Sequence, residues 1–113
     1  IEYKKALDES TTHSPVLFNK LAGSYLLTQK YQEAEALLKE SLEFFPHFPT
    51  TLTNLGELYF SNEEYQIARV YFEKAVHINP FNPFVHMRLI HVYEKLELEN
   101  EKELQIRQFK YID

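Results

Sequence analysis

Residues 49–82 read PTTLTNLGELYFSNEEYQIARVYFEKAVHINPFN, and this stretch decides the fold. In its first half, residues recur at i, i+3, i+4 and i+7, the spacing of one face of an α-helix: Leu52, Leu55, Gly56 and Tyr59. A second set follows at similar spacing: Tyr65, Ala68, Phe72 and Ala75. Pro80 then ends the second helix, because proline lacks an N–H and clashes with the preceding turn. The stretch therefore predicts two helices joined by a tight turn.

Capping residues indicate where the helices begin. Ser61 and Glu64 have the spacing of a capping box, so we expect the second helix of this stretch to start there. A residue that caps helices well precedes a proline at the first helical position twice: Ser14-Pro15 and Asn82-Pro83. Pro46 is expected to end a helix in the same way as Pro80.

The same pattern recurs with a period of 34 residues. Three triplets share this spacing: Pro15, Pro49 and Pro83; Leu21, Leu55 and Leu89; and Tyr25, Tyr59 and Tyr93. A fixed period of about 20–50 residues is typical of stacked repeat units. The repeats are therefore residues 15–48, 49–82 and 83–113, and the recurring tyrosines are predicted to lie in the core.

The middle repeat resembles the tetratricopeptide repeat (TPR) family. The resemblance rests on Leu55-Gly56, Tyr59, Ala68, Phe72, Ala75 and Pro80. It implies an all-α fold, a right-handed α-solenoid of tandem 34-residue helix-turn-helix repeats. The family's usual tryptophan is absent, and Phe18, Leu52 and His86 occupy that position. Small residues are expected where helices approach closely: Ala22, Ala34, Gly56, Ala68 and Ala75.

The domain organisation follows from the repeats. We expect one TPR domain over residues 1–113, with residues 1–14 as the tail of a helix from a preceding repeat. The third repeat, 83–113, is degenerate, since larger residues stand where small ones are expected: Ile90, Lys102 and Phe109. Its second helix is still expected, from Leu104, Ile106, Phe109 and Ile112. Because the chain begins and ends in repeat phase, we expect it to be a fragment of a longer protein.

Composition excludes several classes of function. The net charge of −5 argues against a nucleic-acid partner, which needs a basic surface. No run of about 18 uncharged apolar residues exists, so no membrane insertion is expected. Cysteine is absent, His86 and His91 lack the spacing of a metal-binding pair, and no phosphate loop or activated nucleophile is visible. We therefore expect no metal, no cofactor and no enzymatic activity.

The first helix of each repeat is expected to line a concave groove. The candidate groove residues are Asn19, Lys20, Leu27, Asn54, Glu57, Phe60, Phe84, Met87, Arg88 and His91. Lys20, Asn54 and Arg88 occupy the same position in successive repeats, and form either a ladder of ligand contacts or a solvated face. Phe84 is either an apolar anchor or packs on the turn around Phe81. The groove-facing positions together carry a formal charge of +1, which favours a neutral or mildly acidic ligand.

The favoured function is a non-catalytic scaffold that binds a peptide segment or a partner helix in this groove. The alternative is a structural spacer or a self-association module within a larger protein. Members of the family that bind chaperone tails hold carboxylates with a clamp of Lys, Asn, Asn, Lys and Arg. The corresponding residues here are Asn19, Gly23, Asn54, Phe84 and Arg88, and only Asn54 and Arg88 match. Binding of heat-shock chaperone tails is therefore not expected.

Overall fold

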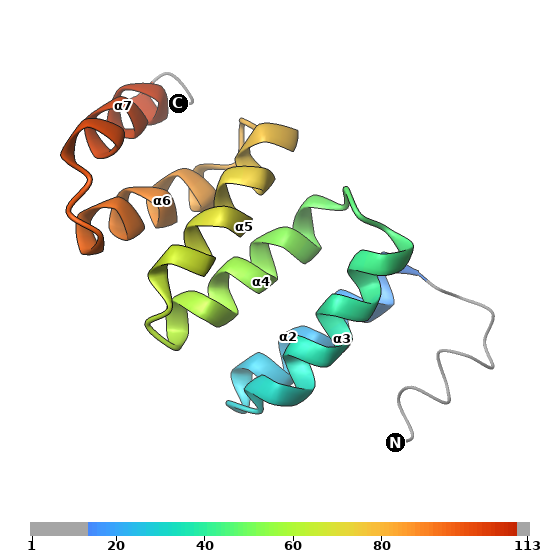
Figure 1. Cartoon of the computed structure of the whole chain (residues 1–113). Coiled ribbons are helices and arrows are strands. Elements are labelled where there is room, and N and C mark those ends of the chain that lie inside the picture. The colour runs from blue at the N-terminus through green and yellow to red at the C-terminus, as the bar shows by residue number, and fades with distance from the viewer. Residues whose placement is uncertain (1–13, 111–113) are drawn as a thin grey trace.

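The computed structural model describes residues 14–110, and within that range the chain is built from helices alone (Figure 1). The helices are α2 (Pro15–Leu27), α3 (Tyr31–Phe44), α4 (Pro49–Ser61), α5 (Tyr65–Ile78), α6 (Pro83–Lys95) and α7 (Glu99–Lys110). Each helix packs on the next, and α2 also contacts α4. The result is an elongated molecule with extents of 47 × 25 × 20 Å. The predicted all-α solenoid of helix-turn-helix units is confirmed.

Helix ends repeat in phase with the sequence. The first helices of the three repeats each begin at a proline, and α3 and α5 end before Pro46 and Pro80, as predicted. Of the two predicted N-caps, Asn82 makes its bond, accepting from the amide of Phe84 at 3.0 Å. Ser14 stands at the N-cap of α2 without a side-chain cap hydrogen bond. The N-terminal tail predicted over residues 1–14 lies, apart from Ser14, outside the described residues, as does Ile112.

The turn inside each repeat is closed by a left-handed residue that is not glycine. Gln29, Glu63 and Glu97 have φ angles of 59°, 61° and 58°. In the middle repeat the amides of Glu63 and Glu64 donate to the carbonyls of Phe60 and Tyr59, at 3.0 and 2.8 Å. This bond pair is the Schellman motif of helix C-termini.

The predicted capping box at Ser61 and Glu64 is wrong. Ser61 is the last residue of α4, while α5 takes Glu64 as its N-cap and makes no side-chain cap bond. The serine is still helical when the chain turns, so its hydroxyl is not placed to cap the next helix. The turn is instead held by the main-chain bonds that follow the left-handed residue.

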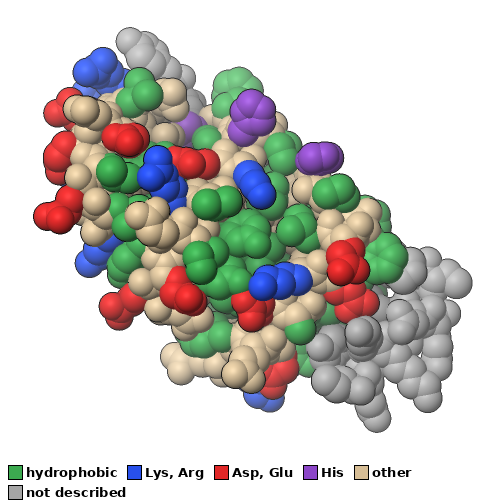
Figure 2. Space-filling view, viewed as in Figure 1, with side chains coloured by type: hydrophobic (Ala, Val, Ile, Leu, Met, Phe, Trp, Pro, Cys, Tyr) green, Lys and Arg blue, Asp and Glu red, His purple; other side chains and the backbone are tan. Residues whose placement is uncertain are grey.

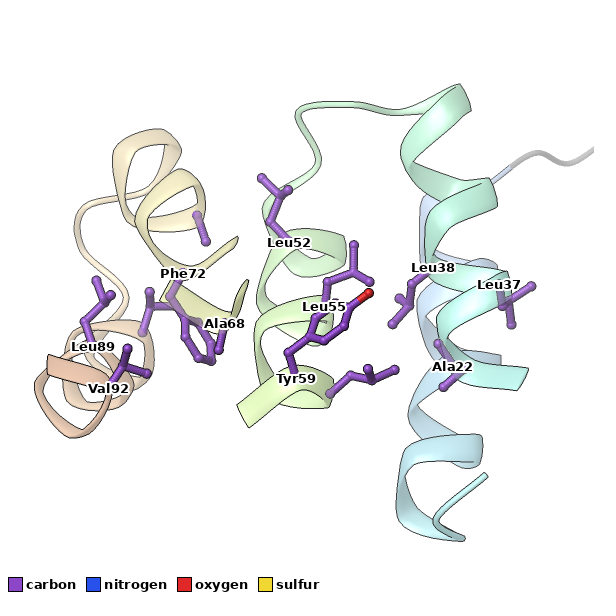
Figure 3. Close-up of a cluster of buried hydrophobic side chains, with 14 of the residues drawn as sticks. Ala22, Leu37, Leu38, Leu52, Leu55, Tyr59, Ala68, Phe72, Leu89 and Val92 are labelled. Carbon is purple, nitrogen blue, oxygen red and sulfur yellow. The ribbon is translucent and has the colours of Figure 1, made fainter. Parts of the chain in front are cut away.

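The core runs through all three repeats, and small residues allow its helices to approach closely (Figure 3). The alanines predicted for this role, Ala22, Ala34, Ala68 and Ala75, are buried. Gly56 is the tightest position, because a Cβ added there would lie 2.7 Å from the Phe72 ring atoms Cδ1 and Cε1. The ring of Phe72 is itself fully buried. The middle repeat is therefore packed around a glycine that no larger residue replaces without movement.

Two tyrosines connect consecutive repeats by hydrogen bonds. Tyr93 on α6 donates to Glu73 on α5 at 2.6 Å, and Tyr59 on α4 donates to Glu35 on α3. Burial, followed by the bond to its glutamate, raises the pKa of each tyrosine. The bond from Tyr59 holds the pKa of Glu35 below its ordinary value, and Lys39 acts in the same direction. Both tyrosines are buried, as the sequence predicted, whereas the third recurring tyrosine, Tyr25, packs against the core but is only partly buried.

The last helix, α7, is attached mainly through polar groups. Its buried residue is Gln105, whose amide nitrogen bonds to Nδ1 of His86. The other ring nitrogen of His86 lies 2.6 Å from the carbonyl oxygen of Pro80, and the ring stacks on Phe109 at 6.3 Å. Leu104, predicted as part of an apolar face, is 54% exposed. A polar interface thus replaces the small-residue packing of the first two repeats.

Candidate functional site

A hollow of about 620 Å³ lies on the face formed by the first helices of the repeats, α2, α4 and α6. Six of the predicted groove residues line it: Asn19, Lys20, Leu27, Asn54, Glu57 and Phe84. The other four, Phe60, Met87, Arg88 and His91, do not line it. The hollow therefore spans mainly the first two repeats and reaches the third only at Phe84.

Asn19 borders this hollow, but its side chain is used inside the protein. It is 7% exposed, and its amide nitrogen donates to the carbonyl of Pro15 at 2.7 Å and to Oγ1 of Thr51 at 2.8 Å. Its oxygen accepts from Asn54 Nδ2 at 2.8 Å. Ser41 extends the network to α3, 3.3 Å from Thr51 Oγ1. These bonds satisfy both amide hydrogens, so Asn19 positions Asn54 rather than offering free groups to a ligand.

Asn54 and Lys20 are two of the polar groups that line the hollow and keep hydrogen-bonding capacity for a ligand. The bond to Asn19 uses one amide hydrogen of Asn54, and this half-buried side chain keeps its carbonyl oxygen and second hydrogen. Lys20 is exposed and has no carboxylate partner within residues 14–110. An amide that both donates and accepts suits the main chain of an extended peptide, and an unpaired ammonium suits a carboxylate.

Arg88, the third member of the predicted ladder, is held in place by its neighbours. Its Nε and Nη2 both bond to the carboxylate of Glu57, the latter at 3.3 Å. Its guanidinium carbon lies 4.9 Å from the ring centroid of Phe60 and 5.1 Å from that of Phe84. Such stacking stabilises a planar cation. The pair with Glu57 also cancels the one negative charge that lines the hollow, so Lys20 sets its net charge.

Apolar groups complete the hollow. Leu27 is 88% exposed, and Phe84 is exposed on one side while its ring contacts Arg88. Phe60, on the far side of Arg88, packs edge-on against Tyr65 with ring centroids 5.4 Å apart. The ring of Phe84 thus packs on the guanidinium group of Arg88. Leu27 and Phe84 are the most exposed apolar side chains that line the hollow.

Two side-chain arrangements were not visible in the helix pattern. The network of Asn19, Ser41 and Thr51 has one available signal: one repeat later, Thr51 and Ser41 correspond to Val85 and Ala75. Polar residues that replace apolar ones at a packed position indicate an internal hydrogen bond. The contacts that Arg88 makes with Glu57 and Phe60 have no comparable signal, because these two residues lie on a different helix, α4.

Other kinds of site were also searched for. Over residues 14–110, the acids and histidines form no group of three placed to hold a metal ion. In the same part of the chain, each helix is too short or too polar to cross a bilayer.

Comparison with known proteins identifies the repeats. Models of the tetratricopeptide repeat match residues 17–44 and 49–82. Curated proteins include no significant match to the chain. Similar solved structures include MamA, with 20% identity, 98% of this chain covered and a TM-score of 0.86. Another is pilF of Pseudomonas aeruginosa, with 23% identity, 99% of this chain covered and a TM-score of 0.84.

A third similar structure is titled as the first TPR of Spaghetti (RPAP3) bound to the HSP90 peptide SRMEEVD. The match covers 88% of this chain and 79% of the chain in that structure, with 18% identity and a TM-score of 0.81. The chain spans 64% of the MamA chain and 51% of the pilF chain. At these identities the structures show the fold, and the repeat models show the family. The chain belongs to the tetratricopeptide repeat family.

Proposed function

We propose that the chain is an interaction scaffold that binds a peptide segment or a partner helix in the hollow between α2 and α4. The family and the fold support a protein-interaction scaffold, since members of this family are in general non-catalytic interaction modules. The observation that carries the finer proposal is the hollow itself. It combines an unpaired cation, a half-used amide and two exposed apolar side chains.

Each group has a separate role in the proposed complex. Asn54 bonds the ligand main chain, and the network behind it fixes its orientation through Asn19. Lys20 pairs with a carboxylate of the ligand, while Leu27 and Phe84 contact an apolar side chain. Because the groups are held on rigid helices, little conformational entropy is lost on binding.

The ligand is not expected to be a chaperone tail. One similar solved structure holds an HSP90 peptide, but this chain has Asn19, Gly23 and Phe84 where the clamp of the family has lysine, asparagine and lysine. Asn19 and Arg88 also have their donors engaged internally. The chemistry left in the hollow fits an apolar segment with a single acidic group.

The test is selection of peptides on the wild-type protein from a random library, followed by titration of the selected peptides. Lys20→Glu combined with Leu27→Asp removes the cation and an exposed apolar contact without touching the core, and we expect at least about tenfold weaker binding. Lys110→Glu combined with Leu104→Asp makes the same two kinds of substitution at exposed residues of α7 that do not line the hollow, and is the matched control. Equal binding by all three proteins would refute the groove. Failure to recover any peptide would favour a spacer.

A further inference from the structure

A second hollow, of about 790 Å³, lies on the face opposite the groove, between the second helices of the first two repeats, α3 and α5. Figure 2 looks onto this face and shows hydrophobic side chains gathered at its centre, with Lys, Arg and His side chains and also Asp and Glu side chains around them. Leu52 of α4 is 2% exposed and forms the base, whereas Val70 and Ile78 of α5 are 47% and 38% exposed. Apolar side chains that stay exposed around a hollow are typical of an interaction site.

The polar rim of this hollow is basic in effect. Lys74 lies over the ring of Tyr71, at 5.8 Å from its centroid, and pairs with no carboxylate among residues 14–110. His47 and His77 add imidazoles, which donate hydrogen bonds to carboxylates. The acid that lines the hollow, Glu73, already accepts bonds from Tyr93 at 2.6 Å and Arg69 at 3.0 Å. An acidic partner is therefore attracted here although the chain carries −5 overall.

The walls of the hollow favour a helix over an extended strand. Both α3 and α5 satisfy their main-chain groups internally, so the walls consist of side chains and have no free edge for strand pairing. A helix brings its own main-chain bonds, and its apolar stripe fits between two parallel ridges of side chains.

We propose that this hollow, named here the α3–α5 hollow, binds an amphipathic helix of a partner protein, with leucine or isoleucine facing Leu52 and Val70 and carboxylates facing Lys74 and the two histidines. This surface is separate from the groove of the proposed function. Binding at one face therefore does not depend on binding at the other.

The test uses three labelled synthetic peptides and fluorescence anisotropy. The first is a helical peptide with leucines at i, i+3, i+4 and i+7 and glutamates beside them; the second has lysines in place of the glutamates. The third is a scramble of the first without the apolar stripe. We expect the glutamate helix to bind, and the other two to bind at least about tenfold more weakly.

Variants of α5 place the binding site. Val70→Asp buries a carboxylate against the apolar stripe and Lys74→Glu reverses the rim charge, so both should weaken binding of the glutamate helix about tenfold or more. Ile67→Asp is the matched control, since it is 41% exposed on the same helix but does not line the hollow. Lys20→Glu with Leu27→Asp should leave this binding unchanged and so separates it from the groove.

Three results would overturn the inference. One is equal binding of the glutamate and lysine helices, and another is binding that neither Val70→Asp nor Lys74→Glu weakens. The third is a concentration-dependent mass that Val70→Asp abolishes, because the occupant would then be a second copy of this chain. If Val70→Asp unfolds the protein, Lys74→Glu still decides, since it changes charge without changing the apolar contacts.

Discussion

The two glycines of the chain should respond in opposite directions to the same substitution. Gly23→Ala and Gly56→Ala both replace glycine in a helix, which on its own stabilises the helix by about 1 kcal/mol. At Gly23 the added Cβ meets no atom within 4 Å, so the free energy of unfolding should rise by about 0.5–1 kcal/mol. At Gly56 it meets three atoms of the Phe72 ring at 2.7, 2.7 and 2.9 Å.

The cost at Gly56 follows from how little the ring is able to move. Ordinary van der Waals contact begins at 3.4 Å, so the ring or the helix must shift by several tenths of an ångström. Phe72 is 0% exposed and has no adjacent solvent to move into. Overpacking of this kind costs about 1–3 kcal/mol, or more where the backbone must move. After the helix gain of about 1 kcal/mol is subtracted, we expect Gly56→Ala to destabilise the protein by about 0–2 kcal/mol, and by more where the backbone must move.

Urea denaturation followed by circular dichroism measures both changes in the free energy of unfolding. In a thermal melt, each kcal/mol of this change should move the melting temperature by about 4–8 °C. A double-mutant cycle with Phe72→Leu tests the cause, because the smaller side chain should relieve the clash. The double variant should then lose less free energy of unfolding than the two single variants lose together. The reasoning is refuted if Gly56→Ala stabilises as Gly23→Ala does, or if the cycle is additive.

Three further predictions test other parts of the fold. Glu63→Gly should stabilise the protein by about 0.5–1 kcal/mol, because φ at this residue is 61°, while Ala36→Gly, at an exposed position inside helix α3, should cost about 1 kcal/mol. Thermal melts that show the same sign for both would contradict the Schellman turn. Ala68→Leu, at a fully buried position, should cost about 1–3 kcal/mol in urea denaturation, and a wild-type midpoint would mean that Ala68 is not at a tight contact. The raised pKa of Tyr93 means that its phenol ionises at a lower pH in the unfolded chain than in the folded one. The contribution of Tyr93 to the free energy of unfolding is therefore complete below about pH 10 and falls above it. Tyr93→Phe should flatten this fall in thermal melts between about pH 9 and 11, and an unchanged slope would exclude Tyr93 as its cause.

The repeat period and the helix boundaries were predictable because they depend on local sequence. Proline positions and 3.6-residue periodicity act within one helix, and the structure begins α4 at Pro49 and ends α5 before Pro80, as predicted. The capping-box prediction was wrong because two local signals compete in this turn. Ser61 has the correct spacing to Glu64, but Tyr59 and Phe60 supply the carbonyls of a Schellman turn, which closes the helix first.

The roles of the groove side chains were less predictable, because they depend on distances between helices. Asn19 and Arg88 are polar residues at groove positions, and nothing within their own helices shows that Thr51 and Glu57 lie within reach. The repeat phase helps only where successive interfaces differ, as Thr51 and Val85 do. Glu57 and Arg88 occupy different positions in their respective repeats, so the 34-residue period does not predict that they pair.

Both proposed binding faces depend on helix α4. Its residues Asn54 and Glu57 line the groove, and Leu52 forms the base of the α3–α5 hollow. In a solenoid each helix gains stability mainly from its neighbours, and α4 has six buried residues where α7 has Gln105 alone. Local opening should therefore begin at α7, which lines neither hollow, because little apolar area is lost there. Both hollows are lined mainly by the first two repeats, and Phe84 of α6 is the residue of the third repeat that takes part, so neither proposed site requires α7 to be docked.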